Sequence, residues 1–481
     1  MLACVSTELP RSTPADQHVD PGAVLAFVDA VDADPVVELH SLMVVRHGHV
    51  VAEGWWAPHT PERTRLLYSL SKSFTSTALA FALQEGLVAL DDTLVSHFPE
   101  FEADITDPRS RSVTLRHLAS MASGHDREMM HEAVTRDPQE PVRGFLLVPP
   151  DEEPGSIFAY SQPCTYALGS VIQRAAGMPL TDYLRPRLFD PLGIGEVGWL
   201  TWPPGREQGF SGLFARTEDV AKLGQLYLQR GRWGDRQLIG DGYVEQATSQ
   251  QIDTVNRPGG PDWRQGYGFQ FWMSRHGYRG DGALGQFCVV LPEHDAVVAT
   301  TAGTEDMQAV LDHLWQHLLP GFAGSRPDGS AQRNLEERLA GLRLPSCVAQ
   351  PAPPQWAGWT GGPFAVAPGA EGLAAASLSS VELREGANGL EVTIAEAGNA
   401  LTFPVGATDW QVSAPRDASG EAVPVAASGG WLDDHTVRVE LIFLESPHRM
   451  DITCALPTRI AEAVWRHQPL EDRLGRQHRP R

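Results

Sequence analysis

The chain has 481 residues, too many for one ordinary hydrophobic core, so two or three domains are expected. Its formal net charge is −22, from 38 Lys and Arg against 60 Asp and Glu with no basic block, which argues against a nucleic-acid or anionic-membrane partner. Five scattered cysteines without a close pair indicate a reducing, cytoplasmic compartment, and no uncharged apolar run is long enough to span a bilayer.

The first strong pattern in chain order is LHSLMVVRHGHVVAEGWW, which begins at Leu39 and predicts two strands around a tight turn at His47-Gly48. The segment YSLSKSFTSTALAFALQEGL follows and predicts a helix that begins near Ser69. Residues 112–239 are expected to be mostly helical, because VTLRHLASMASG, TYALGSVIQRAAG and TEDVAKLGQLYLQRG each end at a glycine suited to a helix C-terminus.

Strand patterns return over residues 266–303 and precede a last helix, DMQAVLDHLWQHLL. Strands at both ends with helices between them predict one sheet built from distant parts of the chain. Beyond residue 322 come a short helix, NLEERLAGL, and a Pro-rich link, PAPPQW. Short alternating runs such as GLEVTIAEA and HTVRVELIFLES then predict a small antiparallel barrel or sandwich.

These patterns predict an α+β fold class for the chain. The expected boundaries are a first domain over 1–322, a linker with a short helix over 323–355, an all-β domain over 356–465 and a tail over 466–481.

Ser69 and Lys72 are three residues apart at the start of the expected helix. A serine at that place is also an ordinary N-cap. Lys72 would lie one turn further along, on the face that carries Leu79 and Leu83, where a lone buried ammonium is costly and tends to lose its proton. A lysine of lowered basicity beside a serine accepts its proton, so the pair is a candidate for nucleophilic catalysis.

Four segments occur in a fixed order: YSLSKSFTS, VTLRHLASMASG, FAYSQPCTYALGSVI and DGALGQFCVVLPEHD. Together they resemble the penicillin-binding-protein and class C β-lactamase superfamily of serine hydrolases over residues 24–319, and most of all its esterase and amide-hydrolase branch, which includes 6-aminohexanoate-dimer hydrolase. The resemblance implies a β-lactamase-like fold, with an antiparallel sheet flanked by helices and a helical subdomain. It implies no metal or organic cofactor.

The resemblance also assigns roles to residues. Ser69 would be the nucleophile, Lys72 its base or proton relay, and Tyr160, in YSQ, the group that moves protons to and from the leaving group. The backbone N–H groups of Ser69 and Ala283 would form the oxyanion hole. The substrate-binding residues would be Gln162, Gly282, Gly285 and Gln286, with Gly282 leaving room for the substrate against its strand.

Two positions depart from the superfamily pattern. Gln162 stands where Asn is usual, which keeps the amide but lengthens its reach. Gly280 stands where Lys or His is usual; Arg279 should point to the opposite face of the strand, while a lysine at 280 would face the cleft. Since that cation normally recognises a substrate carboxylate, an ester or amide without an obligatory carboxylate is the favoured substrate.

The sequence therefore predicts a serine hydrolase that acts through an acyl-enzyme on small esters or amides, a class that extends to D-peptides and β-lactam-like compounds. Alternatives on the same fold are an acyl transferase, a peptide-cyclising enzyme, or a non-catalytic binding or sensor protein. A weaker alternative is a histidine phosphatase, because VVRHGHV would supply Arg46 and His47, although His47-Gly48 also suits a hairpin turn.

Several other side chains are weaker candidates. His117 and the histidine of SGHD, His125, are expected to be structural, and no histidine pair has a convincing zinc spacing with a third ligand. Tryptophans are candidates for the lining of a substrate cleft: Trp55, Trp56, Trp263 and Trp272.

Overall fold

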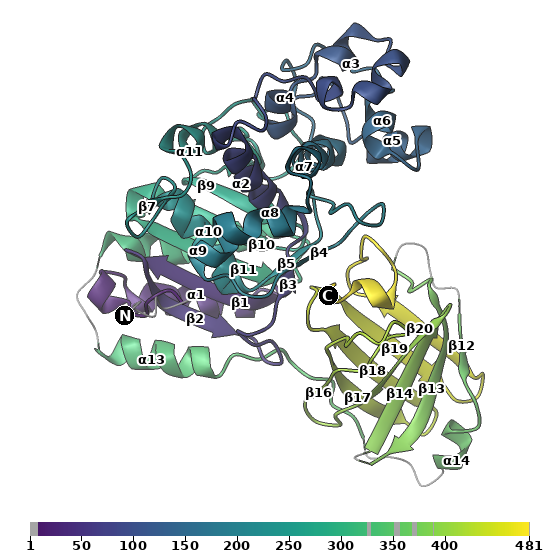
Figure 1. Cartoon of the computed structure of the whole chain (residues 1–481). Coiled ribbons are helices and arrows are strands. Elements are labelled where there is room, and N and C mark those ends of the chain that lie inside the picture. Colours follow the sequence, from purple (N-terminus) through teal and green to yellow (C-terminus); the bar gives the residue numbers. More distant parts are fainter. Residues whose placement is uncertain (1–7, 325–328, 351–355, 368–372, 388, 481) are drawn as a thin grey trace, which may run out of the picture. The chain divides into compact units, whose positions relative to one another are not determined.

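The computed structural model describes residues 8–324, 329–350, 356–367, 373–387 and 389–480. The chain divides into two compact units (Figure 1). The first unit comprises Met1–Gly54 with Leu67–Ala340, and the second comprises Trp55–Leu66 with Gly341–Arg481. Within the expected Pro-rich link, residues 351–355 lie outside the described residues.

The first unit is built on a six-stranded sheet whose strand order is β2-β1-β11-β10-β9-β8. Strands that are far apart in the sequence are neighbours in it, as predicted. The hairpin turn between β1 and β2 is His47-Gly48, with φ of +49° and +74°, a conformation that suits a two-residue turn. The strand bounds are β1 Leu39–Arg46, β2 His49–Trp55, β8 Trp272–Met273, β9 Tyr278–Gly282, β10 Gln286–Leu291 and β11 Ala296–Ala302.

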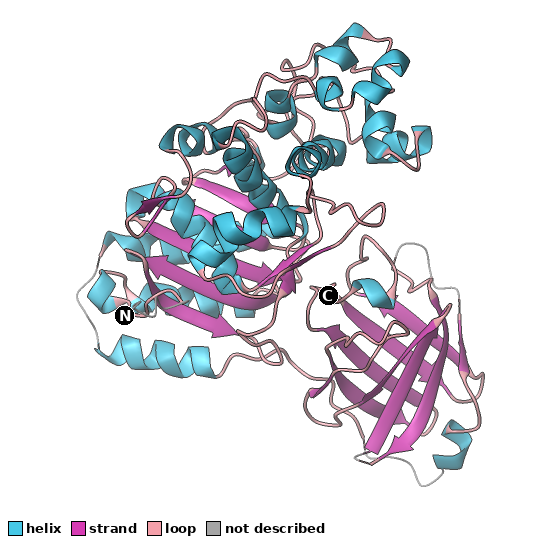
Figure 2. Ribbon diagram, in the orientation of Figure 1, coloured by secondary structure: helices cyan, strands magenta, loops and turns pink. Residues whose placement is uncertain are grey.

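Helices cover this sheet and form a separate group beside it (Figure 2). The amphipathic helix α10 packs against β1, β10 and β11, whose residues are almost all buried. Helix α2 is buried over nearly its whole length and packs against α7. The helix bounds are α1 Pro21–Ala33, α2 Ser71–Gln84, α3 Pro108–Ser112, α4 Leu115–Ala119, α5 Met130–Arg136, α6 Pro141–Leu146, α7 Gln162–Ala176, α8 Leu180–Leu184, α9 Asp190–Leu192, α10 Thr217–Leu228, α11 Asp241–Ala247, α12 Met307–His313 and α13 Gly329–Ala340.

Shorter strands lie outside the large sheet. Strands β4 and β5 pair with each other, as do β6 and β7. Their bounds are β4 Gly198–Trp199, β5 Leu213–Ala215, β6 Arg232–Trp233 and β7 Arg236–Gln237. No helix in the described parts of the chain is both long enough and apolar enough to cross a membrane.

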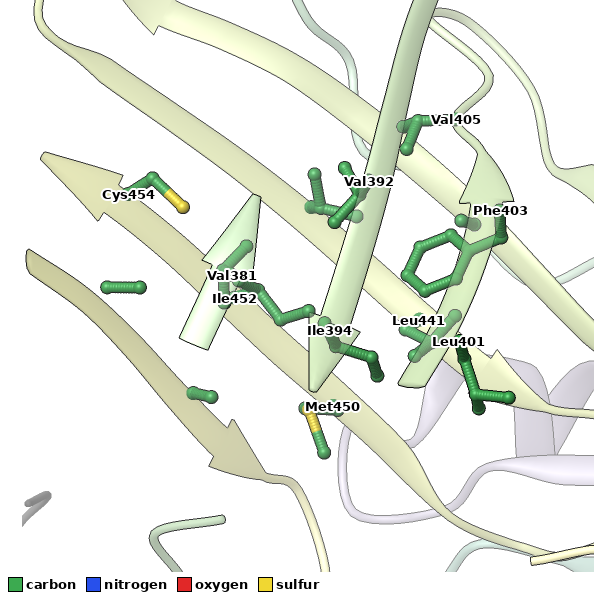
Figure 3. Packing of buried hydrophobic residues seen from close by; sticks show 14 of the residues in the cluster. Val381, Val392, Ile394, Leu401, Phe403, Val405, Leu441, Met450, Ile452 and Cys454 are labelled. Carbon is green, nitrogen blue, oxygen red and sulfur yellow. The ribbon is translucent and has the colours of Figure 1, made fainter. Parts of the chain in front are cut away.

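The second unit is a nearly closed, barrel-like β-domain with strand order β15-β14-β13-β12-β20-β19-β18-β17-β16. Gly406, just after β15, exchanges backbone hydrogen bonds with β17, which brings the two ends of the sheet together. Alternating apolar residues fill its interior (Figure 3). The bounds are β12 Phe364–Val366, β13 Leu378–Gly386, β14 Gly389–Glu396, β15 Asn399–Pro404, β16 Gln411–Ser413, β17 Val425–Asp433, β18 Thr436–Phe443, β19 Arg449–Ala455 and β20 Ile460–Trp465, with helix α14 at Trp356–Trp359 and β3 at Arg65–Leu66.

The α+β fold class is thus confirmed, with a sheet and helices in the first unit and an all-β second unit. The helix of the SLSK segment begins later than predicted. Residues Tyr68–Leu70 form a 3₁₀ turn, and α2 begins at Ser71, two residues beyond Ser69. Tyr68 has a left-handed φ of +49°, an unusual conformation for a bulky residue, and this tight turn delays the α-helix.

Candidate active site

Ser69 lies in the 3₁₀ turn that precedes α2, half-buried between two fully buried neighbours, Tyr68 and Leu70. Lys72 follows in the first turn of α2, and its Nζ donates a hydrogen bond to Ser69 Oγ at 3.0 Å. The sequence predicted this contact from helical spacing. The turn keeps the two side chains on one side although Ser69 is not itself in the α-helix.

Lys72 is 1% exposed, and its ammonium has three hydrogen-bond acceptors. Besides Ser69 Oγ, these are Gln162 Oε1 at 2.6 Å and the carbonyl oxygen of Phe210 at 2.8 Å. Burial lowers the pKa of Lys72 to about 7, against the opposing influence of Glu128 and Asp281. Near neutral pH, a substantial fraction of Lys72 is therefore the neutral amine that accepts a proton.

Tyr160 lies in the loop before α7 and lines the same cleft as Ser69. Its hydroxyl lies beside the Ser69 side chain, and Lys72 Nζ lies 4.8 Å from the centroid of its ring. The ring also stacks on Trp272 at 5.4 Å between centroids. Burial raises the pKa of Tyr160, so the phenol stays protonated. Of the two groups, Lys72 is the better proton acceptor and Tyr160 the better donor.

Gln162 is the first residue of α7, and its longer side chain reaches Lys72 directly. Its backbone N–H donates to Glu128 Oε2 at 2.8 Å, and Met130 N donates to Glu128 Oε1 at 2.7 Å. Glu128 thereby brings a negative charge close to Lys72. Sequence reasoning missed Glu128, because it lies in a loop without a motif of its own.

A cleft of about 530 Å³ opens at Ser69. Tyr160, Gln162 and Ala283 line it, as expected for the candidate site. Of the four candidate tryptophans, Trp263 and Trp272 are among its wall residues, whereas Trp55 and Trp56 are not. The remaining wall comes from two loops, strand β9 and the start of helix α12, namely Arg257, Pro258, Gly259, Gly260, Asp281, Glu305, Asp306, Met307 and Gln308.

The GDGA motif runs along β9 and into the following turn, and its faces are the reverse of those predicted. A Cβ on Gly280 would lie 2.5 Å from Leu70 Cδ1 and 2.6 Å from Ser73 Oγ, so this face packs on the 3₁₀ turn and on α2. The expectation that a lysine at 280 would face the cleft is therefore wrong. Asp281, the next residue, lines the cleft instead.

Three of the residues expected to bind substrate instead contact other parts of the protein. A Cβ on Gly282 would lie 2.1 Å from the carbonyl oxygen of Leu67, so this glycine makes room for the Ser69 turn rather than for a substrate. Gly285, with φ of +86°, forms the turn after β9. Gln286 is 1% exposed, and its amide donates to the carbonyls of the same turn. None of the three is among the described residues that line the cleft, because the strand and its turn direct them into the protein.

The histidine candidates are structural as well. His47 forms the β1–β2 turn and contacts Gln17, and the Arg46 guanidinium lies over Phe322, away from the cleft residues. His117 completes a capping box at the start of α4, and His125 bonds Ser123 and the carbonyl of Val148. Across the described ranges, no three His, Cys, Asp or Glu side chains gather to hold a metal ion.

Comparison with known proteins identifies relatives of this chain. Lovastatin esterase of Penicillium rubens is 27% identical over 199 residues, which cover 37% of this chain and 49% of that protein. Esterase EstB of Burkholderia gladioli is 26% identical over 220 residues, which cover 40% of this chain and 56% of that protein. The chain thus spans about half the length of these two curated relatives.

A solved structure from Bacillus anthracis, provisionally assigned as a 6-aminohexanoate-dimer hydrolase, has the same fold. It superposes with a TM-score of 0.51 at 18% identity, over 64% of this chain and 86% of that chain. The Beta-lactamase family model matches residues 26–320, more than half of the sequence and the whole set of candidate site residues. On this match, and on the fold that accompanies it, the chain belongs to the β-lactamase family.

Proposed function

We propose that this protein is a serine hydrolase that acts through an acyl-enzyme on small esters or amides. One observation carries the proposal: Ser69 Oγ accepts a hydrogen bond from the buried Lys72 Nζ, and Ser69 and Tyr160 together line a cleft large enough for a small substrate. The names of the two esterases among its relatives support an ester as substrate. Four described cysteines are free thiols, which supports a reducing compartment such as the cytoplasm.

The proposed acylation begins when Ser69 Oγ attacks the substrate carbonyl carbon and neutral Lys72 takes the hydroxyl proton. The backbone N–H groups of Ser69 and Ala283 would hold the oxyanion, since Ala283 lines the cleft just beyond β9. As the carbon–oxygen or carbon–nitrogen bond breaks, Tyr160 gives its proton to the leaving group and recovers one from the Lys72 ammonium.

Deacylation reverses these roles. Water attacks the acyl carbonyl, and its proton passes to the Tyr160–Lys72 pair. The bond to Ser69 Oγ breaks, Oγ regains a proton, and the carboxylic acid leaves. The protonation states of Lys72 and Tyr160 are the ones that both half-reactions need.

Intact-mass detection of an acyl adduct tests the proposal. We expect a panel of chromogenic esters and a fluorophosphonate probe to add to the wild type but not to Ser69→Ala, whose fold should be retained. Lys72→Ala and Tyr160→Phe should each slow acylation by orders of magnitude and be poorly additive, because they act on one proton. Retained ester turnover in Ser69→Ala would disprove the mechanism.

A further inference from the structure

Three arginines lie near β9, and two of them are fully occupied. Arg275 forms ion pairs with Asp262 and Asp312. Arg279 is completely buried; its guanidinium pairs with Asp281 at 3.1 Å and donates to the carbonyl of Asp262 at 2.9 Å. Neither arginine has its charge available to a ligand in the cleft.

Arg257 is different. Its guanidinium lies over the Trp272 ring at 4.7 Å and over the Tyr160 ring at 5.6 Å, and its Nη1 donates a long hydrogen bond, 3.5 Å, to the carbonyl of Pro258. Among the described residues, no ion pair joins Arg257 to a carboxylate; the nearby Asp281 is paired with Arg279. Asp281 also acts on Arg257 through its charge, but it is ion-paired with Arg279, so a bound anion would offset more of the cost of desolvating the Arg257 guanidinium.

The position of Arg257 indicates which part of a substrate it would meet. It lines the cleft at Ser69 and also a second hollow of about 590 Å³, and the two hollows share Tyr160, Arg257 and Pro258. An anion on Arg257 would therefore lie on the Tyr160 side of Ser69. Under the proposed function, Tyr160 protonates the leaving group, so this is the leaving-group side.

The second hollow continues beyond Arg257 with an apolar wall. Ile157, Phe158 and Ile252 line it together with Val255, whose side chain is 56% exposed. Asp126 and Arg127 also line this hollow and pair with each other at 2.8 Å. The hollow thus combines the Arg257 guanidinium, which it shares with the cleft at Ser69, with apolar surface, and together they fit an amphiphilic group that ends in an anion.

We propose that Arg257 binds a carboxylate or similar anion on the leaving-group half of the substrate, and that the apolar part of that leaving group occupies the second hollow. This inference rests on the proposed function. It makes Arg257, rather than a residue of the GDGA motif, the determinant of charge specificity. It also replaces the expectation of a substrate without a carboxylate by a substrate class: esters or amides of anionic leaving groups.

Matched substrate pairs test this inference. The first pair is the butyrate esters of 3-hydroxybenzoate and 3-hydroxybenzamide, which differ only in the charge of the leaving group. The second pair is phenyl hydrogen succinate and phenyl succinamate, which place the same difference on the acyl half. The measured quantity is the ratio of kcat/KM within each pair, at low ionic strength, because each ratio is independent of general losses of activity.

The wild type should prefer the 3-hydroxybenzoate ester, and Arg257→Gln should lower that preference by about tenfold or more, as for loss of a hydrogen bond to a charged group. Arg257→Lys keeps the charge but not the fork-shaped donor and should give an intermediate ratio. Arg232→Gln, which removes an exposed arginine that lines neither hollow, is the control and should leave both ratios unchanged. An unchanged first ratio in Arg257→Gln, or a change confined to the succinate pair, would overturn the assignment.

A binding experiment separates this inference from the proposed function. In Ser69→Ala, titration calorimetry with 3-hydroxybenzoate should detect binding, and adding Arg257→Gln should weaken it by about tenfold or more. If no ester is hydrolysed by the wild type, the proposed function fails while this titration still decides the role of Arg257. Equal affinity with and without Arg257 would refute the anion site.

Discussion

Lys72 is the residue through which the candidate site responds to pH. Lys72 is buried with three hydrogen-bond acceptors, and burial lowers its pKa to about 7. Only the neutral amine accepts the Ser69 proton. We therefore expect kcat/KM for a neutral ester to be constant well above pH 7 and to fall about tenfold for each pH unit below it. A pH–rate profile checks this; a rate that is flat down to pH 5 would exclude Lys72 as the base.

The variant Gln162→Glu tests the contact between Gln162 and Lys72 directly. Gln162 Oε1 lies 2.6 Å from Lys72 Nζ, so a carboxylate of almost the same shape would favour the ammonium. The pKa seen in the profile should then rise by about one unit or more, with activity recovered at high pH. Gln162→Asn keeps the charge and shortens the side chain; it should lower the rate without this shift. A profile of unchanged midpoint in Gln162→Glu would show that Lys72 does not set it.

Arg257 marks the limit of what the sequence shows about single residues. The SLSK spacing predicted the Ser69–Lys72 contact because both atoms belong to one local turn. Arg257 comes from an irregular loop between α11 and β8, and only tertiary packing brings it beside Tyr160. Arg279 and Asp281 are a different case. They are two apart in a strand, so their pairing was open to prediction from the alternation of side chains.

Among the elements, β9 and the 3₁₀ turn fit against each other through glycine. A Cβ on Gly282 would meet the carbonyl oxygen of Leu67 at 2.1 Å, and backbone atoms cannot yield as a flexible side chain does. We expect Gly282→Ala to push the turn from the strand, destabilise the fold by about 1 to 3 kcal/mol and slow labelling of Ser69 by a fluorophosphonate. Thermal unfolding and timed mass spectrometry measure the two effects.

Gly242→Ala is the matched control, because a Cβ there meets nothing within 4 Å and the residue lies in α11. Normal labelling in Gly282→Ala would mean that the turn adapts to the extra methyl group.

The order of elements was predictable, while their ends and faces were less so. The β1–β2 hairpin and α7, which is capped by Gly177 with φ of +68°, follow from local turn and cap chemistry. The faces of β9 did not follow, because two glycines leave no apolar alternation to show which side is buried. VTLRHLASMASG gave only the short helix α4, since Met121 takes a left-handed φ of +58° soon after Ala119.

At the scale of the whole molecule, the chain passes between the units just before the candidate nucleophile. It leaves the first unit after Gly54, contributes Trp55–Leu66 to the second and returns at Leu67, two residues before Ser69. Within the second unit, Leu66 N donates to the carbonyl of Glu445 at 2.8 Å, and Arg65 Nη1 donates to that of Leu444 at 3.0 Å. The β-domain thus holds the segment that leads into the Ser69 turn.

Arg65→Met tests whether these hydrogen bonds affect the stability of the protein and the acylation of Ser69. Arg65 is 3% exposed, and its loss would leave the buried carbonyl of Leu444 without this donor, at a cost of about 1 to 3 kcal/mol. We expect a lower midpoint of thermal unfolding and slower acylation of Ser69, since the loosened segment enters its turn directly. Arg63→Met is the control: Arg63 is two residues earlier in the same segment, and its Nε has no hydrogen-bond partner within the described parts of the chain. If Arg65→Met lowers stability but leaves the acylation rate at the wild-type value, the β-domain stabilises the chain without positioning Ser69.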